Sequence, residues 1–198
     1  ERLGGLVRTV TITNLAGAKK DVEVLDGMPA LLPYGIALKD MKETAQTTKA
    51  WMQVEDVNEK LPYYRVRIAD AAEVSEVEAG NFMVSVNKNG EKLPIIADPE
   101  LIFDYDTSLA KPVKFFQTEV LALAAEHQLC ANQVPAGFAC AHEEITDSYT
   151  IYSVYGQAGT KELFHTFADA GLNAAYFARK HEENDAIINE LADTIATT

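Results

Sequence analysis

The chain has 198 residues, of which 30 are acidic and 17 basic, for a formal net charge of -13. This length supports one hydrophobic core with an extension, and a hydrophobic content of 47% excludes a disordered or collagen-like chain. Because an acidic surface repels phosphate groups and anionic lipid headgroups, we expect neither nucleic acid nor a membrane as a partner.

Two segments of alternating pattern stand near the start of the chain. Residues 6–13 place Val10 and Ile12 on one face and threonines on the other, which is typical of a half-buried strand. Residues 21–25 resume the alternation after a turn-like stretch. The two segments together predict a β-hairpin.

The middle of the chain predicts an irregular segment followed by short strands. Residues 31–54 contain Pro33 and Gly35 and then apolar residues at helical spacing, so we expect a loop and a short helix there. Residues 116–127 fit either a strand or a helix. Further strands are predicted at residues 63–68, 82–86, 93–96, 101–105, 138–141 and 149–155. Short strands at this spacing predict a mostly β protein built as an antiparallel β-sandwich.

The pattern becomes helical after Gly156. Thr160 fits a helix N-cap, and the residues that follow carry an apolar stripe. The stripe contains Leu163, Phe164, Phe167, Phe177, Ile187, Ile188, Leu191 and Ile195. We therefore expect a β-sandwich domain over residues 1–156 and a helical linker over residues 157–198, whose apolar face packs on the sandwich or on a further domain.

Neither the start of the chain nor its cysteines identify a compartment. The chain begins at Glu1 without an initiator methionine or a signal peptide, so we expect a piece of a longer protein. The composition predicts a soluble protein, with cytoplasm and periplasm both open. Cys130 and Cys140 could pair if they lay on neighbouring strands, but two buried free thiols are the favoured interpretation.

No sequence motif marks a catalytic centre. The chain lacks a G-x-S-x-G elbow, a P-loop, an H-E-x-x-H pair and a dinucleotide fingerprint. His142 stands beside Glu143 and Glu144, yet no second ligand follows at a usual metal spacing, which favours a solvated strand end. We therefore predict no catalytic residue, no metal and no cofactor.

Carboxylates and aromatic rings suggest contact with sugars. Asp104 and Asp106 would lie about 7 Å apart at the end of the strand predicted over residues 101–105, and a glycosidase needs two carboxyls flanking one bond. An acidic turn is the favoured interpretation of the pair. Aromatic rings pack on the C–H face of a pyranose, although packing in the core or at a domain interface is the favoured interpretation of these rings. The predicted carbohydrate-binding residues are Trp51, Tyr34, Tyr63, Asp104 and Asp106.

Two stretches resemble a known family. They are Arg8-Thr-Val-Thr-Ile-Thr-Asn-Leu15 with the nearby Val22-Glu-Val24, and Tyr149-Thr-Ile-Tyr-Ser-Val-Tyr-Gly156 with the helical pattern after it. The combination resembles the supersandwich domain and linker helices of cellobiose-phosphorylase-like enzymes and related glycoside hydrolases. In that family the linker leads to an (α/α)6 barrel, which carries the catalytic acid and the phosphate-binding residues. The resemblance leaves residues 31–133 unplaced.

The resemblance implies a non-catalytic domain of a larger glycoside phosphorylase or hydrolase. Such a domain supports the barrel, shares in homodimer contacts and borders the oligosaccharide cleft, so we expect this part alone to be inactive. Two alternatives from other classes stay open. One is a freestanding carbohydrate-binding module, and the other is a protein-interaction domain that uses the helical stripe.

Overall fold

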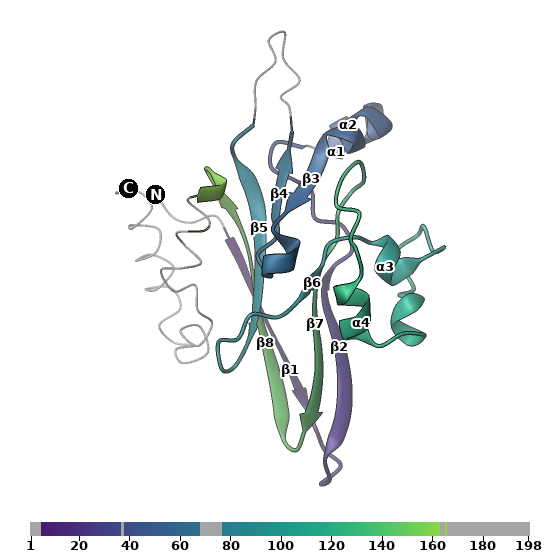
Figure 1. Ribbon diagram of the computed structural model, residues 1–198, viewed down its shortest axis with the longest axis vertical. Helices are drawn as coiled ribbons and strands as arrows, with labels where there is room; N and C mark the ends of the chain where they lie inside the picture. Colours follow the sequence, from purple (N-terminus) through teal and green to yellow (C-terminus); the bar gives the residue numbers. More distant parts are fainter. Residues whose placement is uncertain (1–4, 37, 68–76, 163–164, 166–198) are drawn as a thin grey trace.

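The computed structural model describes residues 5–36, 38–67, 77–162 and 165, and in this part of the chain it is mostly β (Figure 1). A five-stranded antiparallel sheet has the order β1-β8-β5-β4-β3, and a three-stranded antiparallel sheet has the order β2-β7-β6. The strands are β1 (Gly5–Thr13), β2 (Lys20–Met28), β3 (Met52–Glu55), β4 (Tyr63–Val66), β5 (Gly80–Asn87), β6 (Ile95–Ile96), β7 (Gly137–Ile145) and β8 (Ser148–Ala158).

The first two strands do not form a hairpin, so this prediction was wrong. β1 pairs with β8 in one sheet, and β2 pairs with β7 in the other. β7 and β8 are also consecutive in the sequence, yet β7 belongs to the three-stranded sheet and β8 to the five-stranded sheet. Both chain reversals, at residues 14–19 and 146–147, therefore meet at one end of the molecule, where the Asn14 N–H donates to the Asp147 carbonyl at 2.6 Å (Figure 1). Alternation predicts which residues face a core, and it does not predict which strand lies alongside.

One hydrophobic core joins the two sheets. On β8 the inward residues Tyr149, Ile151 and Tyr155 pack with Ala139 and Ala141 of β7. The same core takes in Val24, Leu31, Val54, Tyr64, Met83, Leu93, Ile95, Ala97 and Ile145. Packing of alternate residues from both sheets into one cluster is the arrangement expected for two stacked antiparallel sheets.

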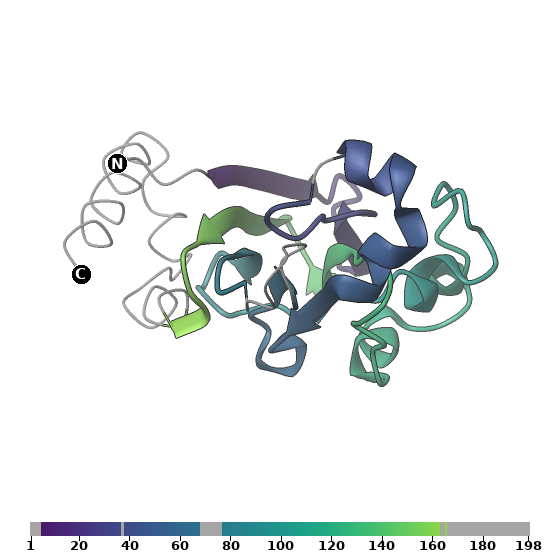
Figure 2. The ribbon, with the colours of Figure 1, turned by 90° about the horizontal axis from the view of Figure 1, so that it is seen from above.

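A short helical layer covers the other face of the three-stranded sheet. It consists of α3 (Glu100–Phe103), η2 (Lys114–Phe116) and α4 (Val120–Ala125), and Figure 2 shows this teal part of the chain gathered on one side. Phe138 and Cys140 of β7 pack against Leu123 and its neighbours, and the rings of Phe103 and Phe138 meet edge to face at 5.9 Å. The three-stranded sheet is thus covered on both faces around Phe138 and Cys140, and its end near the reversals is more exposed.

The helix α3 replaces the strand predicted at residues 101–105. The Asp98 carboxylate accepts the N–H of Glu100 at 2.9 Å, and Pro99 follows Asp98 at the start of the helix. These are the ordinary signals of a helix start. The buried apolar run that follows fits a strand and a helix equally well, because it is too short to show a period. Residues 116–127, which were ambiguous, contain the helix α4.

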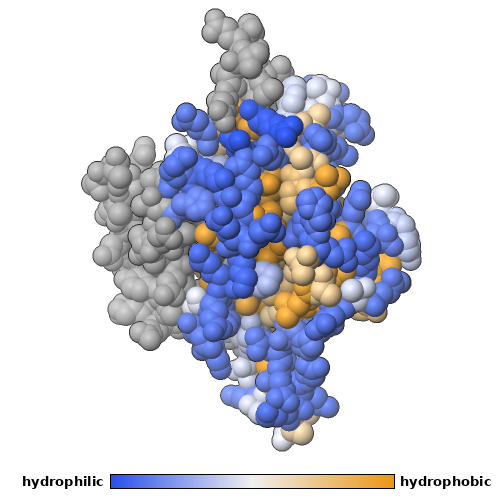
Figure 3. Space-filling view, viewed as in Figure 1, coloured by the Kyte–Doolittle hydropathy of each residue, from blue (hydrophilic) through white to orange (hydrophobic). Residues whose placement is uncertain are grey.

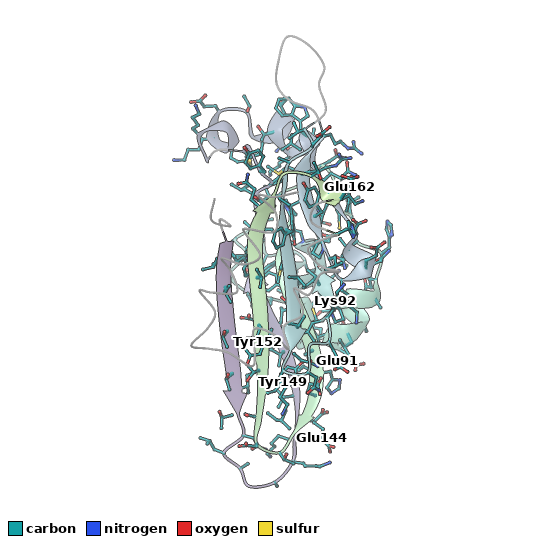
Figure 4. All side chains as sticks on the ribbon, turned by 90° about the vertical axis from the view of Figure 1, so that its left-hand side faces the viewer. Glu91, Lys92, Glu144, Tyr149, Tyr152 and Glu162 are labelled. Carbon is teal, nitrogen blue, oxygen red and sulfur yellow. The ribbon has the colours of Figure 1, made fainter. Side chains whose placement is uncertain are left out.

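Residues 31–54 form a loop followed by short helices, as expected, and they also include a short strand. The segment contains α1 (Leu38–Glu43), α2 (Ala45–Trp51) and the edge strand β3, and η1 (Val57–Glu59) follows. Figure 4 shows the length of β8, with Tyr149 and Tyr152 in its lower half, Glu144 near the reversals and Glu162 at the opposite end.

Most of the helical linker predicted over residues 157–198 lies outside the described residues. Its first part is anchored, because the Lys161 ammonium lies 2.9 Å from carboxylate oxygens of both Glu55 and Asp56. The imidazole of His165 lies 2.8 Å from the same Asp56. Within the described ranges, no helix combines the length and apolarity needed to cross a membrane.

Candidate functional site

A groove of about 540 Å³ opens at the end of the sheets away from the chain reversals. The first residues of β1 and β5, the last residues of β2 and β8 and residues 30–32 line it. Its side chains include Leu6, Met28, Leu31, Asn81, Tyr155 and Gln157. The space-filling view shows apolar residues reaching the surface in the middle of one face, whereas the reversal end is mostly hydrophilic (Figure 3).

The chemistry of the groove suits a small amphipathic ligand. Apolar and aromatic side chains form most of the lining, and the amides of Asn81 and Gln157 add polar groups. The Asn81 amide nitrogen donates to the Leu32 carbonyl at 2.8 Å, which fixes the orientation of this side chain. Apolar walls with a few placed polar groups are typical of small-molecule sites in general.

A partly buried polar cluster lies between the sheets near this end. The Arg8 guanidinium of β1 reaches across to Asp26 of β2, with 2.6 Å between nitrogen and Oδ1. Desolvation raises the pKa of Asp26, and the charge of Arg8 opposes this shift. Desolvation also raises the pKa of Tyr155 to about 12, so its hydroxyl stays protonated. Neither Asp26 Oδ2 nor the Tyr155 hydroxyl has a hydrogen-bond partner among the described residues.

The five residues predicted to bind carbohydrate are spread over separate elements, and none of them lines the groove. Tyr34 is exposed in the loop before α1, and Trp51 is half-buried at the end of α2. Tyr63 is fully buried in β4, where its hydroxyl donates to the Glu78 carbonyl at 2.8 Å. Its ring could not stack on a sugar in this conformation.

Asp104 and Asp106 lie in a turn after α3 and not on the face of a strand. Asp104 has a φ of 52° at the end of the helix. The Asp106 carboxylate accepts the N–H groups of Ser108 at 3.0 Å, Ala110 at 3.1 Å and Lys111 at 2.6 Å, and it also accepts the Ser108 hydroxyl. The hydrogen bond from the Ser108 hydroxyl and those from the backbone lower the pKa of Asp106. This carboxylate therefore organises the turn.

A second polar site surrounds His142 on the helix-covered face of the three-stranded sheet. Its Nδ1 lies 2.8 Å from Glu119 Oε1, and its Nε2 lies 2.7 Å from Asp21 Oδ1. Hydrogen bonds to Glu119 and Asp21 raise the pKa of His142. Glu23 stands directly opposite His142 in the β2–β7 register, and its Oε1 accepts the Val120 N–H at 2.9 Å.

This site could not be predicted from the sequence, because its members are far apart in the chain. His142 was interpreted as a solvated strand end, and the structure surrounds it with acids from β2 and from the residue before α4. The alternation of β2 does place Asp21 and Glu23 on one face. Only the pairing of β2 with β7 brings that face to His142.

Both cysteines are free thiols, in agreement with the favoured interpretation. Cys140 is buried and Cys130 is partly buried. Burial raises the pKa of each thiol to about 12, with the charge of Asp98 adding to the shift at Cys130. Neither thiol is therefore ionised near neutral pH, which argues against a nucleophilic role.

No protein-family model matches this chain, and a search of the curated proteins finds no match to it.

Proposed function

We propose that this chain is the non-catalytic, supersandwich-like domain of a larger glycoside phosphorylase or hydrolase. Its role is to support a helical catalytic barrel and to border the oligosaccharide cleft. The observation that carries the proposal is the pairing of the two stretches that resemble this family. Residues 8–13 of β1 run antiparallel to residues 148–153 of β8, with Arg8 opposite Ser153. These residues of the two stretches therefore lie side by side in one sheet, whereas Val22–Val24 lies on β2 in the other sheet.

The contacts of Arg8 support a structural role for the first of these stretches. The buried carboxylate of Asp26 needs a partner, and the half-exposed Arg8 supplies it across the gap between the sheets. The ion pair holds the β1–β8 pair to the β2–β7 pair at the edge where both sheets end. These contacts favour a structural role for Arg8 over a catalytic one.

The position of the groove supports a role at the edge of a cleft. β8 ends at Ala158, and the preceding residues Tyr155, Gly156 and Gln157 line the groove. The linker predicted after β8 therefore leaves the sheet beside this groove and would lead from there to a further domain. Its substrate could then contact residues from both domains.

Activity measurements on the isolated chain and on the complete gene product test this proposal. The chain should neither phosphorolyse nor hydrolyse β-linked gluco-oligosaccharides, measured as sugar phosphate or new reducing ends. The coding sequence beyond Thr198 should encode helical repeats that carry a catalytic acid, and the full-length product should be active. Robust turnover by the chain alone, lost in Asp104→Asn or Asp106→Asn, would refute the non-catalytic role, as would a stop codon directly after Thr198.

A freestanding carbohydrate-binding module is the second candidate, and the apolar lining and amides of the groove favour it. Calorimetric titration with gluco-oligosaccharides separates the two. Binding in the micromolar to millimolar range that is lost in Gln157→Ala and kept in Trp51→Ala would favour the module. Loss in Trp51→Ala alone would place sugar binding on α2, away from the groove.

A further inference from the structure

Three side chains around His142 have the spacing of metal ligands. The ligand atoms of Glu23, Glu119 and His142 all lie within 4.8 Å of one another. Two ligands of one tetrahedral Zn²⁺, each about 2.0–2.2 Å from the ion, lie roughly 3.3 Å apart. Since His142 Nδ1 and Glu119 Oε1 are 2.8 Å apart, a separation of a few tenths of an ångström would admit an ion between them.

The backbone holds these three ligands in place. Glu23 and His142 are opposite one another in the ladder between β2 and β7, so their Cα positions are set by the sheet. Glu119 immediately precedes α4, and the Val120 N–H donates to Glu23 Oε1 at 2.9 Å. That hydrogen bond connects the helix to the strand, and it leaves the second carboxylate oxygen of Glu23 free to bind a metal ion.

Asp21 orients the imidazole of His142 by a hydrogen bond to the ring nitrogen that faces away from Glu119. Its Oδ1 lies 2.7 Å from His142 Nε2, where it accepts the Nε2–H. Nδ1 faces Glu119, to which it donates a hydrogen bond, and a metal ion bound there would replace the proton on Nδ1. A carboxylate that holds the outer nitrogen of a metal-binding histidine is a common arrangement, because it fixes both tautomer and ring orientation.

We propose that His142 Nδ1, Glu119 and Glu23 bind a divalent zinc ion, with Asp21 as the carboxylate that positions the histidine. One nitrogen and two oxygen ligands suit Zn²⁺, and the fourth position would hold water. The site joins β2, β7 and the start of α4, so the ion fastens the helical layer to the sheet. This inference is independent of the proposed function.

A second group with similar spacing provides an internal comparison. Asp56, Glu59 and His165 also bring their ligand atoms within 4.8 Å of one another. There the Lys161 ammonium already lies 2.9 Å from Asp56 Oδ2, so a cation of this chain occupies the position beside the carboxylate. The acids around His142 have no lysine or arginine contact of this kind among the described residues.

Titration of the intact chain with ZnCl₂ near neutral pH, by calorimetry and by equilibrium dialysis, tests the proposal. We expect one Zn²⁺ per chain with micromolar affinity. His142→Gln and Glu119→Gln should abolish the binding, and Asp21→Asn should weaken it about 10-fold. His127→Gln, which changes an exposed histidine of the same chain, should leave the affinity unchanged.

Circular dichroism of each variant guards against a loss that reflects unfolding, and Co²⁺ provides a second measurement. Substituted for Zn²⁺ in the native chain, Co²⁺ should give the intense visible absorption of a four-coordinate site. No saturable binding at millimolar Zn²⁺ would overturn the proposal. So would an affinity that survives His142→Gln in a folded variant, or one that is lost only in Asp56→Asn.

Discussion

Asp26 is the residue whose surroundings oppose its charge most clearly. Its side chain is buried between the sheets, Arg8 contacts one oxygen at 2.6 Å, and the other oxygen has no partner within the described ranges. Desolvation outweighs the attraction of Arg8, so the pKa of Asp26 is raised in the folded protein. A carboxyl group with a raised folded pKa destabilises the fold once it is ionised.

The pH dependence of unfolding should reveal this cost. Below the ordinary carboxyl pKa, Asp26 is protonated in both states and the cost is absent. As pH rises through the folded pKa, the ionised form destabilises the folded state relative to the unfolded chain. Urea unfolding should therefore show the stability difference between Asp26→Asn and the native chain growing in favour of the variant from acidic to neutral pH. Asp147→Asn, at an exposed position, should follow the native profile. The opposite trend in Asp26→Asn would mean that Arg8 outweighs burial.

At the scale of the element, two serines connect β5 and β8 inside the core. Ser85 and Ser153 are opposite in the register, both are fully buried, and their Oγ atoms lie 2.7 Å apart. Each hydroxyl is the partner of the other. Removal of one leaves a buried polar group unsatisfied, whereas removal of both leaves none.

A double-mutant cycle measures this pair. Ser85→Ala and Ser153→Ala should each lower the free energy of unfolding by about 1–2 kcal/mol, because each leaves the remaining buried hydroxyl without its hydrogen-bond partner. The double variant should lose less than the sum, with a coupling of about 1 kcal/mol. Urea titrations of the four proteins provide the values. Additive losses would show that the hydroxyls do not depend on one another.

Strand positions could be predicted from the sequence where strands alternate, and β1, β5 and β8 lie close to the predicted segments. The pairing of the strands could not be predicted. β1 and β2 are neighbours in the sequence, but their partners β8 and β7 come from the far end of the described chain. The acids around His142 were missed for the same reason. The spacing of apolar residues also did not identify α3 as a helix, because its three buried apolar residues are too few to distinguish a helix from a strand.

At the scale of the whole molecule, the three-stranded sheet is the middle of three layers. One face of β7 packs into the core shared with the five-stranded sheet, and the other packs against α3 and α4. Because single residues of β7 alternate between these two contacts, loss of the helical layer also removes support from the core. We therefore expect the three layers to unfold in one transition.

Two leucines of α4 test this cooperativity. Leu123 is 1% exposed and packs against the sheet, whereas Leu121 is 37% exposed on the same helix. Leu123→Ala should cost about 2–5 kcal/mol, and Leu121→Ala should change stability by only about 0.5 kcal/mol. Trp51, the one tryptophan of the chain, lies at the end of α2 next to β3 and reports on the five-stranded sheet by its fluorescence. If the layers unfold as one unit, Leu123→Ala shifts the fluorescence transition of Trp51 and the circular dichroism transition to the same lower urea concentration. A Trp51 transition that stays in place while the dichroism signal shifts would show that the helical layer unfolds separately.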